Sequence, residues 1–284
     1  MPPLKKIAYL LRLPQWSKAA FVFLGVIYSG LPSYLLHALL AAFAFCLLSS
    51  AVYIYNDLHD REHDKVHPKK CRRPLASGEI SLTLAQVLLF SLLIISLVLA
   101  LNISNLLFLI LLCYLIINLA YNYILKKIPI LDVLCIASGF MLRVLAGTLG
   151  IGLPISWWLT CTATLISLFI AFSKRSLEKK LGLSTETRVV LKKYSQPMLD
   201  SLIMLTGVGS FLFYLLYTIV VREEAFYFLI TLPFAAIGLW RFAWLSNRPV
   251  TYNDDPMAVF FHDFLSRLNL LIFLFLTFVA LANG

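Results

Sequence analysis

Long uninterrupted runs of apolar residues are the feature that most restricts how this chain can fold. A helix needs about 20 apolar residues to cross a hydrocarbon layer about 30 Å thick, whereas a membrane strand is shorter and alternates apolar with polar residues. The sequence holds about nine runs of the helical kind, at approximately 17–35, 37–55, 82–101, 104–124, 131–150, 153–172, 198–221, 225–244 and 265–283. We therefore expect an all-α polytopic membrane protein, a bundle of about nine transmembrane helices.

The composition agrees with this expectation and leaves no room for a separate soluble domain. Hydrophobic residues make up 61% of the 284 residues and charged residues 13%. Soluble domains are about 45–50% apolar and about 25% charged. We expect residues 1–284 to form a single integral-membrane domain.

The formal net charge of +10 is placed in a way that argues against nucleic acid as a partner. Nearly all Lys and Arg residues lie in the N-terminal tail and in every second connection between the expected spans. Cytoplasmic loops carry such an excess of positive charge. The pattern predicts a multi-pass protein of the cytoplasmic (inner) membrane, with the N-terminus and the charged loops cytoplasmic and the C-terminus on the opposite side.

Residues 1–16 are expected to lie along the membrane surface. Basic residues before an apolar stretch are typical of a signal peptide, but a small-x-small cleavage site is lacking and further spans follow. We expect an amphipathic helix over residues 4–16, with Lys5, Lys6 and Arg12 facing lipid headgroups.

An acidic motif follows the second expected span, where Asp57, Asp60 and Asp64 are spaced by three and four residues. If the helix continues past the membrane edge, about 100° per residue places these carboxylates on one face, with Asn56 beside them. Such oxygen-rich faces suit Mg²⁺, which binds one or two carboxylates together with substrate phosphate oxygens. The alternative is a solvated helix end whose charges pair with neighbouring basic residues.

A basic run, "HPKKCRRP", comes directly after the acidic motif and supplies His67, Lys69, Lys70, Arg72 and Arg73. Lys and Arg are the side chains that bind phosphate oxygens. A metal-binding face beside a phosphate-binding loop suits a substrate with a diphosphate leaving group. The alternative, contact with anionic lipid, explains the lysines but leaves the acidic motif unexplained.

Three stretches carry a resemblance to a known family. Residues 56–81, "NDLHDREHDKVHPKKCRRPLASGEIS", resemble the N-D-x-x-D-x-x-x-D signature of the UbiA superfamily and its continuation in the decaprenyl-phosphate phosphoribosyltransferase branch. Residues 121–150, "YNYILKKIPILDVLCIASGFMLRVLAGTLG", and 156–178, "SWWLTCTATLISLFIAFSKRSLE", are similar to later motifs of that branch. The likeness spans about residues 14–263 and agrees with a nine-helix bundle.

The resemblance implies a transferase that moves 5-phosphoribose from 5-phosphoribosyl 1-diphosphate to a polyprenyl (decaprenyl-type) phosphate, with pyrophosphate as the other product. It implies Mg²⁺, or Mn²⁺ in its place, as the cofactor held by the acidic motif. It also leaves a runner-up open, the transfer of a prenyl chain from a prenyl diphosphate to an aromatic acceptor.

The connection between the fourth and fifth expected spans separates these two activities. The resemblance implies a second carboxylate pair there in ordinary prenyltransferases, whereas this chain has Lys126 and Lys127 with one acid, Asp132. Additional positive charge suits substrates that carry an additional phosphate. The feature therefore favours phosphoribosyl transfer.

Arg143 lies inside the fifth expected span, where an ionised side chain is costly and usually faces the bundle interior. We expect it to contact a substrate phosphate. The alternatives are an ion pair with Asp132, or the central site of a carrier for an anionic lipid or metabolite.

Lys174 and Arg175, at the end of the sixth expected span, become site candidates through the resemblance, although pairing of Lys174 with Glu178 is an adequate explanation. A loop with Asp254, Asp255 and Asp263 either covers the site or is an ordinary solvated loop. The candidate catalytic residues are thus Asp57, Asp60, Asp64, Arg73, Lys126, Asp132 and Arg143, the candidate phosphate-binding residues are Asn56, His67, Lys69, Arg72, Lys127, Lys174 and Arg175, and the candidate metal ligands are Asp57, Asp60 and Asp64.

Overall fold

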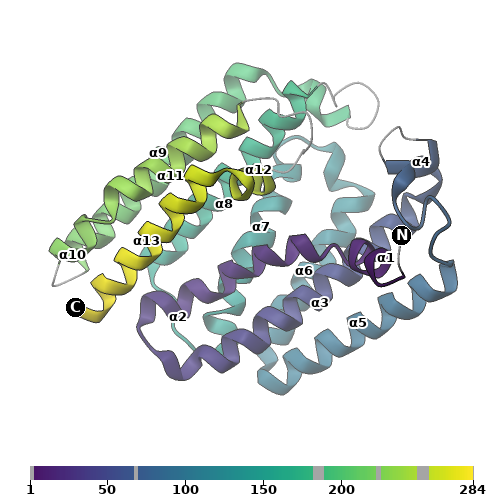
Figure 1. Ribbon diagram of the computed structural model, residues 1–284, viewed down its shortest axis with the longest axis horizontal. Helices are drawn as coiled ribbons and strands as arrows, with labels where there is room; N and C mark the ends of the chain where they lie inside the picture. Colours follow the sequence, from purple (N-terminus) through teal and green to yellow (C-terminus); the bar gives the residue numbers. More distant parts are fainter. Residues whose placement is uncertain (1–2, 67–69, 182–188, 222–224, 248–255, 284) are drawn as a thin grey trace. The chain divides into compact units, whose positions relative to one another are not determined.

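The computed structural model describes residues 3–66, 70–181, 189–221, 225–247 and 256–283, and every regular element in these ranges is a helix (Figure 1). The chain divides into two compact units: unit 1 contains residues 1–122 and 142–155, and unit 2 contains residues 123–141 and 156–284. The all-α fold class is confirmed. The single transferase domain expected over residues 1–284 stays a prediction.

The helices follow one another along the chain with short connections. Those that begin in unit 1 are α1 (Pro3–Leu10), η1 (Leu13–Phe23), α2 (Leu24–Ser29), η2 (Pro32–Tyr34), α3 (Leu35–His59), α4 (Arg61–Val66), η3 (Lys70–Arg72), α5 (Leu82–Ile103), α6 (Asn105–Tyr123) and η5 (Leu149–Ile151). Those that begin in unit 2 are η4 (Leu125–Lys127), α7 (Leu131–Ala146), α8 (Trp157–Lys180), η6 (Val189–Lys193), α9 (Gln196–Val220), α10 (Ala225–Leu229), α11 (Leu232–Ser246), α12 (Pro256–His262) and α13 (Phe264–Asn283). The unit boundary falls inside α7, between Met141 and Leu142.

Eight helical segments among the described residues are long and apolar enough to cross a membrane, and the chain is a multi-pass membrane protein. They are Pro32–His59, Leu82–Ile103, Asn105–Tyr123, Leu131–Ile151, Trp157–Lys180, Gln196–Val220, Phe226–Ser246 and Phe264–Ala282. The first expected span, at 17–35, is instead formed by η1 and α2 in series, and α2 ends at Gly30, whose φ is 66°. About nine spans is consistent with this arrangement.

Serine caps mark the starts of three of the long helices. The side chains of Ser81, Ser156 and Ser195 accept hydrogen bonds from backbone N–H groups three residues later, at 3.2, 3.1 and 3.2 Å. A serine hydroxyl at this position satisfies one of the N–H groups that a helix leaves without a partner. These starts could therefore be located from local sequence.

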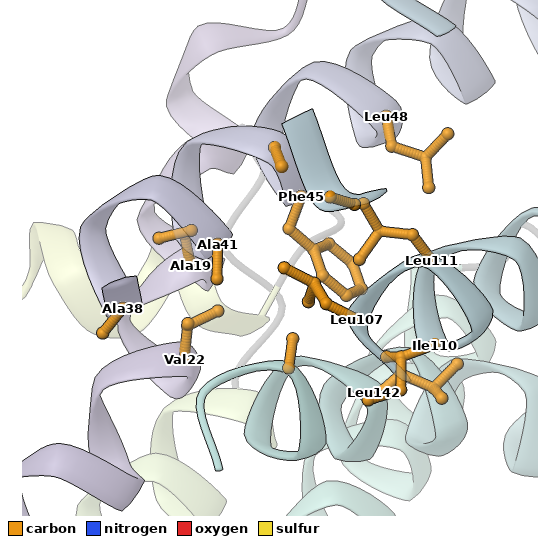
Figure 2. Close-up of a cluster of buried hydrophobic side chains, with 14 of the residues drawn as sticks. Ala19, Val22, Ala38, Ala41, Phe45, Leu48, Leu107, Ile110, Leu111 and Leu142 are labelled. Atoms are coloured by element: carbon orange, nitrogen blue, oxygen red, sulfur yellow. The ribbon is translucent and has the colours of Figure 1, made fainter. Parts of the chain in front are cut away.

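The core of unit 1 forms where η1, α3, α6 and the end of α7 meet (Figure 2). Phe45 of α3 lies at its centre and contacts the ring of Tyr114 edge-on, with ring centroids 4.7 Å apart. Small residues on α3, such as Ala38 and Ala41, let the neighbouring backbone come close to this helix. The other labelled members are Ala19, Val22, Leu48, Leu107, Ile110, Leu111 and Leu142.

In unit 2, α8 packs along α9, and α11 packs against α13. Phe169 of α8 meets Phe242 of α11, with ring centroids 5.3 Å apart. Arg241 and Asp263 form a two-pronged ion pair, with Nε–Oδ2 and Nη2–Oδ1 distances of 3.1 and 2.9 Å. The Arg241 guanidinium and the Ser266 donors hold the pKa of the Asp263 carboxyl down, at about 2. Asp263 therefore caps and anchors α13, and Asp254 and Asp255 lie outside the described residues.

Many large apolar side chains remain exposed on the long helices. On α5, Phe90, Ile94 and Leu101 are 59, 59 and 52% exposed. Large apolar surfaces of this kind are rare on soluble monomers and are what lipid covers in a membrane protein.

Two backbone segments of unit 1 approach each other closely at Gly147. A β-carbon added there would overlap the carbonyl oxygen of Val22, and one added at Gly25 would overlap Gly147 and Thr148. These glycines let the first helical segment press directly against the end of α7.

We predict that Gly147→Ala destabilises the protein by at least about 2 kcal/mol, because rigid backbone and not a flexible side chain must move. Gly209→Ala is the control, since its β-carbon would meet a Leu165 methyl group at 3.4 Å, an ordinary contact. Thermal unfolding of both variants in detergent measures the effect, and equal melting temperatures would contradict the packing described here.

Candidate active site

The cytosol-facing end expected for the second span contains two buried carboxylates. Asp57, on the last turn of α3, and Asp64, on α4, are each 3% exposed. Burial of a charged group is strongly unfavourable unless a partner of opposite charge lies close by. The surroundings of these two side chains therefore decide what this part of unit 1 can bind.

A single nitrogen atom bridges the two carboxylates. Arg73 Nη1 donates to Asp57 Oδ1 at 3.1 Å and to Asp64 Oδ2 at 2.6 Å, and Lys70 Nζ lies 3.9 Å from Asp64 Oδ1. Arg73 follows η3, so the basic run does fold back onto the acidic motif, as the sequence predicts. Two carboxylates close enough to share one cationic group suit a divalent cation that takes its remaining ligands from substrate and water.

Asp60 lies between the two helices that carry this pair. α3 ends at His59, and Asp60 has φ and ψ of −90° and 5° before α4 begins at Arg61. Within the ranges that the structure describes, no three His, Cys, Asp or Glu side chains come close enough together to hold a metal ion. The continuous helix on which the expected face of three carboxylates depended is interrupted at Asp60, and the metal-ligand role expected of Asp57, Asp60 and Asp64 stays a prediction.

The expectation that Arg12 faces lipid headgroups is wrong. Arg12 Nη2 donates to Asp57 Oδ1 at 2.6 Å, and its guanidinium lies over the Tyr53 ring, 4.6 Å from the centroid. Lys6 is also turned inward, with Nζ 3.5 Å from Glu79 Oε2, whereas Lys5 is exposed. The sequence did not reveal the contact between Arg12 and Asp57, because the two residues are 45 positions apart. An arginine in an amphipathic segment is by itself too weak a pattern to indicate such a partner.

Asn56 lies on α3, and Arg143, which lies on α7, contacts the same helix through Ser49. Asn122 on α6 donates to Asn56 Oδ1, and Arg143 Nη2 donates to Ser49 Oγ at 3.1 Å. The Arg143 guanidinium also lies over two rings, 4.6 Å from the Phe45 centroid and 5.3 Å from the Tyr114 centroid. Ring faces stabilise a cation in a site without water. Arg143 thus faces the interior of unit 1, as expected, and its contact with a substrate phosphate stays a prediction.

Unit 2 holds a separate, closed ionic cluster. Asp132 and Arg175 are both 0% exposed, and Arg175 Nε lies 2.7 Å from Asp132 Oδ2 without the alignment of a hydrogen bond. Arg175 Nη1 also donates to Glu178. The alternative considered for Arg143, an ion pair with Asp132, is thus not what the structure has, since Asp132 pairs with Arg175. The roles proposed for Asp132 and Arg175 at a substrate stay predictions that this burial does not favour.

Tyr194 fastens the η6 segment to this cluster. Its hydroxyl donates to Asp132 Oδ1 at 2.6 Å and accepts from the backbone N–H of Ile130 at 2.6 Å. Burial and the hydrogen bond to Asp132 raise the pKa of the Tyr194 hydroxyl above its ordinary value. Ile130 has a φ of 70°, a conformation that a β-branched residue adopts only when its surroundings hold it. Tyr194 was not predicted as a site residue.

The remaining candidates have less defined surroundings. Arg72 and Lys127 are exposed, and Lys126 and Lys174 are half-buried. Lys126 and Lys127 lie on η4, just before Ile130. His67 and Lys69 lie outside the described residues. The phosphate contacts expected of these six side chains stay predictions.

Comparison with known proteins now gives the class of protein that this fold and site define. Residues 19–265 match the model of the UbiA prenyltransferase family. The chain belongs to that family.

Curated relatives include decaprenyl-phosphate phosphoribosyltransferases. The one from Mycolicibacterium smegmatis is 34% identical over 145 residues, which are 51% of this chain and 46% of the relative. The one from Corynebacterium glutamicum is 31% identical over 186 residues, 63% of this chain and 56% of the relative. The chain therefore spans about half the length of the curated relatives it matches.

Solved structures share the fold over nearly the whole chain. A UbiA homolog from Archaeoglobus fulgidus bound to GPP and Mg²⁺ has a TM-score of 0.70 and 19% identity, covering 98% of this chain and 99% of that one. The apo structure of a UbiA homolog from Aeropyrum pernix has a TM-score of 0.66 and 15% identity, covering 90 and 96%. At this identity the likeness establishes the fold alone.

We predict that Tyr194→Phe lowers the stability by about 1–3 kcal/mol, because the buried Asp132 oxygen and the Ile130 N–H both lose their partner. Thermal unfolding in detergent measures the loss, and Tyr227→Phe, at a 36% exposed tyrosine, is the matched control. A Tyr194→Phe melting curve that coincides with the control's would show that the hydroxyl does not fasten η6.

Proposed function

We propose that this protein transfers 5-phosphoribose from 5-phosphoribosyl 1-diphosphate to the phosphate of a long polyprenyl lipid. The observation that carries the proposal is the cationic bridge between two buried carboxylates, Asp57 and Asp64, at Arg73. It combines in one place the groups that would hold a metal and the groups that would hold phosphate. The matched decaprenyl-phosphate phosphoribosyltransferases support the choice of substrates.

Asp57 and Asp64 would hold Mg²⁺, or Mn²⁺ in its place. Asp60 stays a candidate for an indirect contact with the metal, through a water molecule or through the substrate. When bound, the metal would offset the negative charge that builds on the departing diphosphate. Arg73 and Arg72, released toward the substrate, would bind phosphate oxygens as planar forks. Asn56 would keep its orientation through the hydrogen bond from Asn122.

The reaction requires no external acid or base. The bond from the anomeric carbon to the diphosphate oxygen breaks, and its electron pair leaves with pyrophosphate. An oxygen of the polyprenyl phosphate, already anionic near neutral pH, forms the new bond to the same carbon. The residues of the chain therefore act chiefly by positioning two polyanions and by screening their repulsion. We assign this screening to Arg143 alongside the two arginines, and the same role expected of Lys126 and Lys127 from the sequence stays a prediction.

Prenyl transfer is the second candidate. It is favoured by the Archaeoglobus fulgidus homolog of the same fold, which is bound to GPP and Mg²⁺. The same carboxylate pair would serve it. The basic residues Lys126 and Lys127, with Asp132 engaged by Arg175 and Tyr194, argue for a substrate with more phosphate groups.

The proposed location is the cytoplasmic membrane, with the N-terminus and the charged loops on the cytoplasmic side and the C-terminus on the opposite side. The distribution of Lys and Arg along the chain supports this orientation. Phosphoribosyl diphosphate would then reach the site from the cytoplasm.

We predict that Asp64→Asn lowers phosphoribosyl transfer roughly 100-fold or more, because an amide cannot replace an anionic ligand in a charge-stabilising site. Glu62→Gln is the control, since Glu62 lies on the same short helix α4 but is 71% exposed and pairs with Lys65. Product formation by purified protein, followed by mass spectrometry of the lipid, is the measurement. Equal activity in the Asp64→Asn and Glu62→Gln variants, or activity that survives a chelator, would remove the proposed metal role.

We also predict that phosphoribosyl diphosphate, and not a prenyl diphosphate, yields a new lipid product with polyprenyl phosphate as acceptor. Each donor is incubated separately with the full-length protein, and each is then added as an inhibitor of the other. A prenylated aromatic product without any phosphoribosylated lipid would instead favour the second candidate.

A further inference from the structure

Arg12 stands in an unusual backbone conformation for an arginine. Its φ and ψ are 52° and 48°, in the left-handed region, at the junction between α1 and η1. A side chain with a β-carbon is unfavourable there, and glycine is the usual residue where a helix ends in this conformation. A strained residue of this kind persists only where its surroundings hold it and is common at functional sites.

Three contacts hold the segment around Arg12 against one face of α3. Ser50 Oγ donates to the carbonyl oxygen of Leu11 at 2.8 Å, and the Trp16 indole N–H donates to Ser50 Oγ at 3.0 Å. The Arg12 guanidinium lies over the Tyr53 ring. Ser50, Tyr53 and Asp57 follow one another on α3 at spacings of three and four, so these anchors direct Arg12 along the helix to Asp57.

Arg12 and Arg73 use the same oxygen atom. Both donate to Asp57 Oδ1, at 2.6 and 3.1 Å. A divalent cation bound to Asp57 would compete with both guanidinium groups for this carboxylate and would repel them. The Arg12 side chain is 29% exposed, so it has room to move away, and a guanidinium that leaves a carboxylate is suited to bind a phosphate oxygen.

We propose that Arg12 holds the Asp57 carboxylate while no metal is bound, and that a divalent cation arriving with a diphosphate takes its place. This inference rests on the proposed function, because the cation and the diphosphate are the cofactor and the substrate group of that reaction. In the metal-free protein Arg12 keeps the carboxylate oriented and neutralised. On exchange it turns to the diphosphate, so that metal and substrate bind together more tightly than either binds alone.

The geometry provides a variant that should keep its fold. Arg12→Gly removes the guanidinium and places at the left-handed position the residue that suits it best. Lys6→Gln is the matched control, because it removes one positive charge from the same N-terminal segment while its partner is Glu79 and not Asp57. Thermal unfolding verifies that both variants are folded.

Binding of Mn²⁺ alone to the full-length protein is measured by electron paramagnetic resonance of the free ion. We expect Arg12→Gly to bind Mn²⁺ roughly tenfold more tightly than the unaltered chain, because a charge-assisted hydrogen bond no longer competes for Asp57. Lys6→Gln should differ by less than about twofold, since exposed charges interact weakly. Adding inorganic pyrophosphate should tighten Mn²⁺ binding more in the unaltered chain than in Arg12→Gly.

Each outcome bears on the proposal. Equal or weaker Mn²⁺ binding by folded Arg12→Gly, or the same gain from pyrophosphate in both chains, overturns the exchange and leaves the proposed function standing. Failure of every chain to bind Mn²⁺ overturns both. Tighter binding by Arg12→Gly in a protein that transfers no phosphoribose supports the exchange and removes the proposed substrate.

A second measurement follows the segment itself. Trp16 is hydrogen-bonded to the serine that anchors Leu11, so its fluorescence should change when Mn²⁺ and pyrophosphate displace Arg12. The signal should be absent from Trp16→Phe, which retains the other four tryptophans. A fluorescence change that persists in Trp16→Phe, or no change in the unaltered chain under saturating ligand, contradicts a displaced Arg12.

Discussion

The buried carboxylate pair of Asp57 and Asp64 is the constraint on which the arrangement of unit 1 depends. Two negative charges, each 3% exposed, cannot remain beside an apolar helix bundle unless cations lie between them. Arg73 returns from beyond η3 to bridge them, and Arg12 comes from the N-terminal segment to the same oxygen. The short helix α4, the basic loop and the start of η1 are thus all held at one end of α3 by the need to balance this charge.

The two units meet the same electrostatic requirement in different ways. In unit 1 the arginines are reachable from solvent, since the side chains of Arg12 and Arg73 are 29 and 22% exposed. In unit 2 the Arg175 side chain is 1% exposed and is engaged by Asp132 and Glu178. In our proposal the first cluster exchanges its cations for a metal and a substrate, whereas the second is closed and fastens η6 through Tyr194. We therefore propose that the unit 1 cluster takes part in the reaction and that the unit 2 cluster stabilises the fold.

Solved structures and curated relatives resemble this chain in different respects. The fold is shared with solved UbiA homologs over nearly the whole chain although few residues are identical, which is expected when lipid-facing apolar residues replace one another freely. The curated relatives match at higher identity but over about half of their length. The chain therefore belongs to the UbiA prenyltransferase family, and its particular donor and acceptor are matters of the proposal above.

The sequence by itself determined most of the elements: the apolar runs located the membrane-crossing helices, and the motif around Asp57 identified the charged end of α3. These features are local, because hydrophobic length and charge spacing act over a few residues. Only the tertiary structure decided that Arg12 meets Asp57, that Arg175 meets Asp132, and that α3 ends just before Asp60. The partners in these two ion pairs are 45 and 43 residues apart in the sequence, so packing and not local spacing selects them. The break after His59 changes the direction of every side chain that follows it, and local spacing does not reveal such a break.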